Sequence, residues 1–126
     1  MNGTTEQLMI PILCPMKLIT ALIRSEQLPS VKQALFDVQI RHLTATSVLG
    51  TAPKSEQQMY RGVAKEVSLF RRVRLEVAVN DDRLEVAMPA ISDGAHASGG
   101  WGHIFVTELT DAMTIWTGER GSRALH

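Results

Sequence analysis

Apolar and polar residues alternate most regularly in the run Val73 to Val79 (VRLEVAV), where every second residue is apolar. This period of two predicts a β-strand with one buried face. Leu18 to Ile23 is short and apolar, and Leu43 to Leu49 is rich in β-branched residues, so both are also predicted strands. Ile104 to Thr107 predicts a further strand, and Met113 to Trp116 a short final one.

Two stretches show the spacing of helices. Apolar residues recur at helical intervals from Leu28 to Val38, and Pro29 suits the first turn. A second helix is expected from Leu84 to Ile91 after the possible capping oxygens of Asn80 to Asp82, with Pro89 kinking or shortening it. The element order β-α-β-β-α-β predicts an α+β chain with the ferredoxin-like fold.

The connection from Gly50 to Lys65 is the longest interruption of this pattern, and Tyr60-Arg61-Gly62 lies near its tip. Paired strands in compact domains are usually joined by a few residues, so a hydrophilic connection of about 16 residues predicts a binding or partner-reaching loop.

Composition limits the function classes. The 126 residues suffice for one domain. Thirteen basic and thirteen acidic residues give no net charge, so no general attraction to nucleic acid or an anionic membrane is expected. The single cysteine, Cys14, cannot form an internal disulfide, which fits a reducing cytoplasm.

The N-terminal region predicts neither a membrane span nor a secretory signal. Pro11, Pro15 and Lys17 interrupt the apolar stretch, and Met1 to Gln7 has no basic residue. Met16 is the expected start of the folded unit, with residues 1–15 as an extension that is disordered, a packing arm or the product of an upstream start codon.

Five short segments carry a family resemblance: Met16 to Ile23 (MKLITALI), Tyr60 to Gly62 (YRG), Val73 to Val79, Ile104 to Val106 (IFV) and Thr117 to Glu119 (TGE). In this order and spacing the chain resembles the PII signal-transduction family, over nearly all of residues 16–125. Its departures, described below, make it most similar to the carboxysome-associated, bicarbonate-responsive PII-like branch.

The resemblance implies a homotrimer that binds adenine nucleotides between subunits and regulates a transporter or enzyme by docking. It also implies a T-loop at residues 50–65, a B-loop at 96–103 and a C-terminal loop at 117–126 within a domain of residues 16–126. The residues that it implies for docking to the partner are Tyr60, Arg61 and Gly62.

The nucleotide cleft that the resemblance implies consists of Leu22, Thr44, Gly50, Thr51, Ala52, Glu76, Ala78, Gly99, Gly100, Trp101, Gly102, His103 and Arg120. Gly100 and Gly102 would let backbone N–H groups approach a phosphate, although an ordinary glycine-rich turn is the alternative. Glu76 would accept a hydrogen bond from ribose or adenine, or pair with Arg74 as an exposed strand charge. Arg120, with Arg123, could bind phosphate from the C-terminal loop, and a flexible, solvated tail is the alternative.

The chain departs from the triphosphate-binding members of the family. Thr114 and Trp116 stand where those members place two arginines, His103 replaces a lysine, and Pro53 replaces another arginine. Hydrogen bonds to charged groups contribute about 1.5–3 kcal/mol each, so their loss predicts a preference for AMP or ADP, or a cyclic nucleotide, over ATP.

The T-loop also differs from that of the nitrogen-regulating members of the family. Lys65 replaces the tyrosine that is uridylylated in nitrogen-regulating members, and Lys54 replaces a metal-holding glutamine. With Arg72, Lys54 suggests a site for a small oxyanion such as bicarbonate. The alternative is that Arg72 pairs with Glu66 or Glu76.

Other functions fit the sequence less well. A nitrogen-regulatory PII protein responding to ATP, ADP and 2-oxoglutarate is the alternative within the family. No paired nucleophile and base or phosphate loop indicates an enzyme, and the strand Val73 to Val79 lacks the aromatic residues of an RNA-binding sheet. No metal site is predicted, although His96 and His103, with His42 or Cys14, form a weak candidate.

Overall fold

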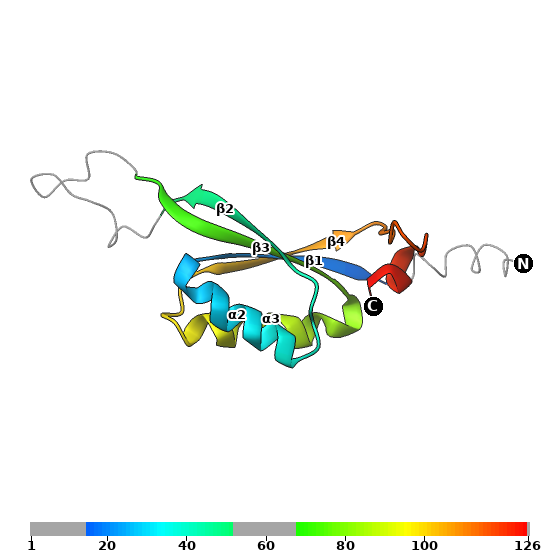
Figure 1. Cartoon of the computed structure of the whole chain (residues 1–126), viewed down its shortest axis with the longest axis horizontal. Coiled ribbons are helices and arrows are strands. Elements are labelled where there is room, and N and C mark those ends of the chain that lie inside the picture. Colours follow the sequence, from blue (N-terminus) through cyan, green and yellow to red (C-terminus); the bar gives the residue numbers. More distant parts are fainter. Residues whose placement is uncertain (1–14, 52–67, 126) are drawn as a thin grey trace, which may run out of the picture.

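A computed structural model of the chain describes residues 15–51 and 68–125. These residues form four strands, two α-helices and three short 3-10 helices (Figure 1). In chain order they are β1 (Met16–Ile23), η1 (Ser25–Gln27), α2 (Leu28–Asp37), β2 (Thr44–Gly50), β3 (Phe70–Asn80), η3 (Asp81–Arg83), α3 (Leu84–His96), β4 (His103–Leu109) and η4 (Gly121–Leu125).

The four strands form one antiparallel sheet in the order β2-β3-β1-β4. On the central strand β1, Ile19 lies opposite Val77 of β3 and Val106 of β4. Both α-helices lie on the same side of this sheet (Figure 1). The ferredoxin-like fold predicted from the element order is therefore confirmed, whereas the trimer stays a prediction.

Alternation along the strands gives the sheet two different faces. The face toward the helices holds the core, in which Ile19, Leu75, Val31 and Ile91 are almost completely buried. Neither α2 nor α3 covers the other face, which we call the open face (Figure 1). Its side chains are Leu18, Thr20, Leu22, Thr44, Thr46, Val48, Arg72, Arg74, Glu76, Ala78, His103, Phe105 and Thr107.

Two features bring α3 close to α2 and to the turn before α2. A Cβ on Gly94 of α3 would lie only 2.7 Å from the Cα of Val31 in α2, so this crossing leaves no room for a side chain. The buried amide of Gln27 accepts from the Arg24 backbone N–H at 2.7 Å and donates to the Ala95 carbonyl at 3.1 Å. Burying this polar side chain is tolerable because both ends of the amide are hydrogen-bonded.

The second helix differs from its sequence prediction. α3 continues past Pro89 to His96, so the expected shortening is wrong. Pro89 lies on the exposed side, where water can satisfy the carbonyl freed by its missing N–H, while Ala87 and Ala90 pack inward. The expected side-chain cap is also absent: Asp81 binds Lys17 at 2.9 Å instead.

The prediction of a final strand from Met113 to Trp116 is wrong. Only Met113 pairs, in an isolated bridge with Arg120, and residues 115–117 form a turn. The Gly118 N–H bonds the Thr114 carbonyl at 2.7 Å, so the chain reverses too tightly to extend a strand.

Some predictions fall outside the described residues: the extension up to Cys14 and the T-loop from residue 52 onward. Among residues 15–51 and 68–125, no helix is both long and apolar enough to cross a bilayer.

Candidate functional site

A cavity of about 830 Å³ lies at one end of the open face, and we call it the C-terminal cavity. Its floor is formed by the strands and its walls by the segment before β2 and the C-terminal segment. The lining residues are Leu18, Arg41, His42, Leu43, Thr44, Glu76, Ala78, Met113, Thr114, Ile115, Trp116, Thr117, Glu119, Arg123, Ala124 and Leu125.

Strand register explains how the floor is assembled. Ala78 of β3 lies opposite Leu18 of β1, and Glu76 lies opposite Thr44 of β2. Side chains two residues apart on a strand point to the same face, so all four project from the open face. Three of them, Thr44, Glu76 and Ala78, belong to the predicted nucleotide set.

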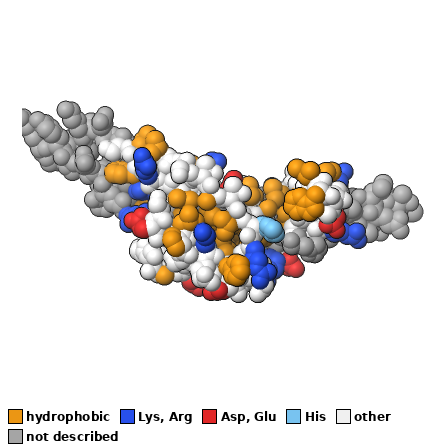
Figure 2. All heavy atoms as spheres, viewed as in Figure 1, with side chains coloured by type: hydrophobic (Ala, Val, Ile, Leu, Met, Phe, Trp, Pro, Cys, Tyr) orange, Lys and Arg blue, Asp and Glu red, His pale blue; other side chains and the backbone are white. Residues whose placement is uncertain are grey.

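The C-terminal wall is a hairpin held by its own hydrogen bonds. The Thr114 N–H donates to the Glu119 carbonyl at 2.9 Å, and its hydroxyl donates to the Ala124 carbonyl at 3.1 Å. These bonds place Ile115 and Trp116 at the tip, where they are 89% and 85% exposed. Figure 2 shows hydrophobic side chains gathered at the surface over this C-terminal segment.

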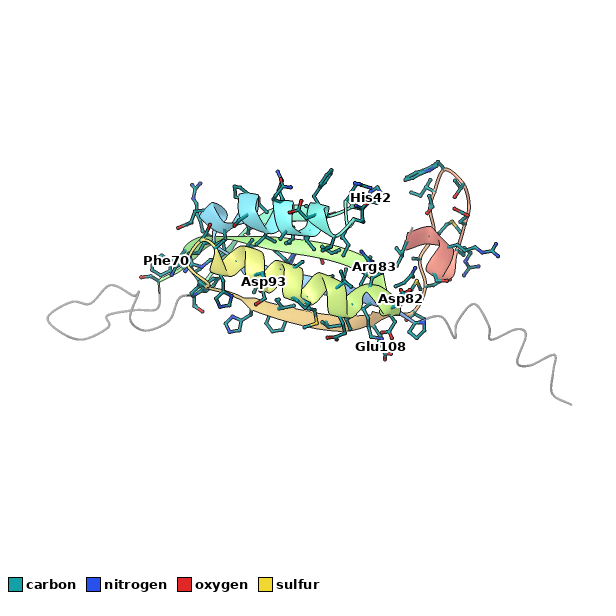
Figure 3. All side chains as sticks on the ribbon, turned by 90° about the horizontal axis from the view of Figure 1, so that it is seen from below. His42, Phe70, Asp82, Arg83, Asp93 and Glu108 are labelled. Atoms are coloured by element: carbon teal, nitrogen blue, oxygen red, sulfur yellow. The ribbon has the colours of Figure 1, made fainter. Side chains whose placement is uncertain are left out.

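Charges of both signs line the C-terminal cavity. Arg41 and Arg123 are matched in number by Glu76 and Glu119, and His42 adds a titratable ring. In Figure 3, His42 lies near the end of α2 and faces the C-terminal segment. The cavity therefore has polar groups for recognition but no concentration of positive charge.

Arg120 takes a different position from Arg123. Its guanidinium pairs with the Asp111 carboxylate, and Arg120 is not among the residues lining the cavity. The hydrogen bond from Arg120, with a second from the Ala112 backbone, lowers the pKa of Asp111 below its usual range.

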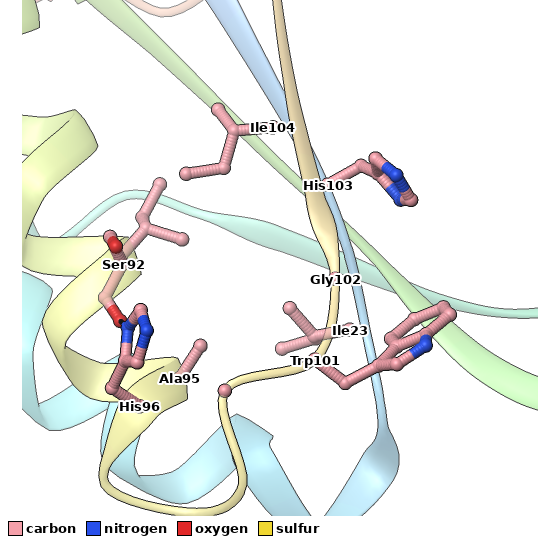
Figure 4. A pocket seen from close by; sticks show the side chains of 10 residues that line it. Ile23, Ser92, Ala95, His96, Trp101, Gly102, His103 and Ile104 are labelled. Carbon is pink, nitrogen blue, oxygen red and sulfur yellow. Dashed lines mark hydrogen bonds between the residues drawn. The ribbon is translucent and has the colours of Figure 1, made fainter. Parts of the chain in front are cut away.

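The predicted glycine loop lies beside a second, smaller pocket of about 90 Å³, which we call the glycine-loop pocket (Figure 4). It is lined by Ile23, Ile91, Ser92, Ala95, His96, Gly100, Trp101, Gly102, His103 and Ile104. In Figure 4 the His96 ring lies on the helix side of β4, and the Trp101 and His103 side chains lie on the other side.

Local contacts explain why two positions of this loop are occupied by glycine. The Gly100 N–H donates to the Ala95 carbonyl at 2.8 Å and so caps α3. A Cβ on Gly102 would lie 2.4 Å from the Leu22 carbonyl oxygen, and its φ of 140° also disfavours a side chain. These contacts explain why glycine is needed at both positions, and the phosphate-binding part of the loop stays a prediction.

Trp101 links this loop to the predicted anion residue. Its ring lies 4.4 Å from the Arg72 guanidinium carbon and 5.7 Å from that of Arg24. Arg72 also contacts the Phe70 ring at 5.4 Å, and is only 7% exposed. Such cation–π contacts hold a guanidinium in place without neutralising its charge.

Within one chain, the predicted nucleotide-binding residues therefore lie in two separate places. Thr44, Glu76 and Ala78 line the C-terminal cavity. Of the predicted B-loop residues, Gly100, Trp101, Gly102 and His103 line the glycine-loop pocket. Leu18 is in the cavity floor, and Leu22, which pairs with His103, is four residue steps further along β1. At the usual strand rise this is about 13 Å.

Several predicted residues contribute to neither place. Gly50 ends β2, where a Cβ would be 3.5 Å from the Arg72 side chain, and Thr51 follows it. Gly99 lines neither pocket. The remaining predicted residues, Ala52, Lys54, Tyr60, Arg61 and Gly62, lie outside the described ranges.

Sequence reasoning missed Arg41 and His42 as part of this site. They form a basic pair directly before a strand, which is a weak signal on its own. Within the described ranges, no group of three or more His, Cys, Asp or Glu side chains is placed to hold a metal ion.

Comparison with known proteins identifies the family. Residues 16–119 match the family model described as nitrogen regulatory protein P-II, so the chain belongs to the P-II family. It is 38% identical to nitrogen regulatory protein GlnK1 of Methanosarcina mazei, over 87% of this chain and 97% of that protein. Nitrogen regulatory protein GlnK of Escherichia coli K12 is 37% identical, over 87% of this chain and all of its own length.

A solved structure extends this comparison. The crystal structure of Arabidopsis thaliana PII bound to citrate matches with a TM-score of 0.70 and 27% sequence identity. The match covers 87% of this chain and 89% of the plant chain.

Proposed function

We propose that this P-II family protein is a non-enzymatic signalling protein that binds AMP or ADP in preference to ATP. The nucleotides occupy clefts between the subunits of a homotrimer. A small oxyanion such as bicarbonate binds at the base of the T-loop, and the protein regulates inorganic-carbon uptake or metabolism by docking to a transporter or enzyme.

The charge balance of the C-terminal cavity carries the nucleotide preference. Its lining has two arginines and two glutamates, and Thr114 and Trp116 of the hairpin add no positive charge. A triphosphate brings more negative charge than a monophosphate and needs more cationic partners when it leaves water. AMP and ADP are therefore the better fit.

The division of the predicted residues supports binding between subunits. The cavity lies toward the start of β1 and the B-loop toward its end. Each would supply only part of the proposed nucleotide site. In a symmetric ring, the cavity of one subunit can face the B-loop of the next, which repeats one complete site at every seam.

The oxyanion site would use Arg72 together with Lys54, and Tyr60, Arg61 and Gly62 would form the docking part of the T-loop. Support comes from Arg72, whose guanidinium is held beneath Trp101 at the start of β3. Because Trp101 belongs to the B-loop, nucleotide and anion would act on the same pair of side chains. Each ligand is then expected to raise the affinity for the other.

Isothermal titration calorimetry tests this function. AMP, ADP, ATP and cyclic AMP are titrated separately, with and without bicarbonate or 2-oxoglutarate. We expect tighter binding of AMP or ADP than of ATP, and a further increase with bicarbonate. If ATP binds more tightly than both AMP and ADP, the proposed nucleotide preference is wrong. If the dissociation constants are identical with and without bicarbonate, the proposed bicarbonate site is wrong. A nucleotide-turnover assay on the same samples tests the alternative that the protein processes nucleotides.

Nitrogen regulation is the second candidate, and the names of the relatives favour it. The Methanosarcina and Escherichia coli proteins are both called nitrogen regulatory proteins. In that case 2-oxoglutarate, rather than bicarbonate, should strengthen binding, and it should do so for ATP. The same titrations distinguish the two candidates.

A further inference from the structure

We propose that Trp116 and Arg123 select the ligand of the C-terminal cavity, with the Trp116 indole stacking on the base and Arg123 binding the phosphate of a nucleoside monophosphate. This inference rests on the proposed function and adds two residues to it. Both belong to the C-terminal segment. The sequence left Arg123 open between phosphate binding and a solvated tail, and it gave Trp116 no part in the site.

Trp116 is presented to the cavity on a fixed support. The hairpin around it is held by the bonds of Thr114 to Glu119 and Ala124, yet its side chain remains 85% exposed. An aromatic ring so displayed gains by covering a flat apolar ligand, and bases stack on such rings largely independently of sequence.

The cavity floor opposite this wall suits a ring. Ala78 and Leu18 are uncharged and apolar, and Ala78 has only a methyl group, which leaves space above β3. Thr44 and Glu76 border them with a hydroxyl and a carboxylate, which can accept hydrogen bonds from an exocyclic amine or ribose hydroxyls. A cavity of about 830 Å³ is within the usual range for small-molecule sites.

Of the two arginines that line the cavity, Arg123 belongs to the same C-terminal segment as Trp116. Arg120 is paired with Asp111, and the Arg41 guanidinium lies over the Phe36 ring at 4.9 Å. Arg123 makes no salt bridge with any residue in the described ranges, and it lines the cavity. Its guanidinium can therefore offer its paired N–H groups to a phosphate.

Titrations with AMP and adenosine separate the two roles. Trp116→Ala should weaken both ligands by about 5- to 150-fold, because both carry the base. Trp116→Phe should restore most of this affinity. Arg123→Gln should weaken AMP about tenfold or more and leave adenosine unchanged, because only AMP carries the phosphate.

Two further variants serve as competitor and control. Arg120→Gln tests the arginine that the family resemblance indicates, and we expect a smaller loss of AMP affinity than with Arg123→Gln. Lys32→Gln removes an exposed charge on α2, away from the cavity lining, and should not change either affinity. Sedimentation velocity on every variant shows whether the assembly is intact.

The outcomes are separable. If the unmodified protein binds no adenine nucleotide, both the proposed function and this inference fail. If it binds AMP and Trp116→Ala or Arg123→Gln binds AMP equally well, only this inference fails. It also fails if Arg120→Gln causes the larger loss, or if Trp116→Ala changes the assembly and not the affinity of the intact assembly.

Discussion

The two faces of the sheet are built from the same strands but are chemically different. On the helix-covered face, Leu75, Val77 and Ile19 are buried by α2 and α3. On the open face, Arg74 and Thr44 are exposed, and Phe105 remains 51% exposed. The first face stabilises the chain, and the second is available for recognition.

This difference shows that the fold and the site make separate demands on one alternating pattern. A strand with period two gives one set of residues to the core and leaves the other set free to vary. Both the C-terminal cavity and Arg72 use this second set. Substitutions on the two faces should therefore have different consequences, which the following predictions test.

The largest effect is expected on the covered face. Leu75→Ala removes a fully buried side chain and should lower the free energy of unfolding by about 2–5 kcal/mol. Arg74→Ala, the next residue along β3 and exposed on the open face, should change it by less than about 0.5 kcal/mol. Urea denaturation followed by circular dichroism measures both, and equal losses would contradict the division between the faces.

An intermediate effect is expected for Phe105→Ser on the open face. If the open face is covered in the proposed trimer, losing the apolar contact of Phe105 should weaken the free energy of association by about 1 kcal/mol per contact. This corresponds to a roughly fivefold weaker association constant. The fold itself should persist, because Phe105 is half exposed within the single chain. Analytical ultracentrifugation measures the association, and an unchanged constant would argue against contact between subunits at this position.

The smallest effect concerns the exposed pair of Asp111 and Arg120. The pKa of Asp111 is lowered in the folded chain, first by the Arg120 hydrogen bond and then by the Ala112 N–H. Its stabilising contribution is therefore present above the unfolded pKa and is lost as the pH falls through the folded pKa. Arg120→Gln should raise the Asp111 pKa in a carboxyl carbon NMR titration, whereas Lys32→Gln should not.

The sequence predicted the elements best where periodicity was strong. The alternation from Val73 to Val79 predicts β3 correctly, although the strand extends from Phe70 to Asn80 because β2 and β1 pair with it over that length. It predicted α3 less well, because whether Pro89 ends a helix depends on whether the freed carbonyl faces water. The strand predicted from Met113 to Trp116 does not form, because backbone hydrogen bonds within the hairpin outweigh the β-branched composition of this segment.

The candidate site was predictable only in part. Thr44, Glu76 and Ala78 were expected from the resemblance and do line one cavity together. Which of two neighbouring arginines faces that cavity depends on the Asp111 partner, nine residues before Arg120. Nor does any local pattern place the segment at Arg41 beside the C-terminal hairpin, because this proximity arises only when the chain folds.

The placement of the two tryptophans has a practical consequence. Trp101 lies against the guanidinium groups of Arg72 and Arg24, while Trp116 stands in solvent on its hairpin. Indole emission depends on such surroundings, so each ring is an intrinsic fluorophore with its own spectrum, one beside the stem of the T-loop and one beside the cavity. Replacing either ring with phenylalanine leaves an optical probe that follows a single locus without any attached dye.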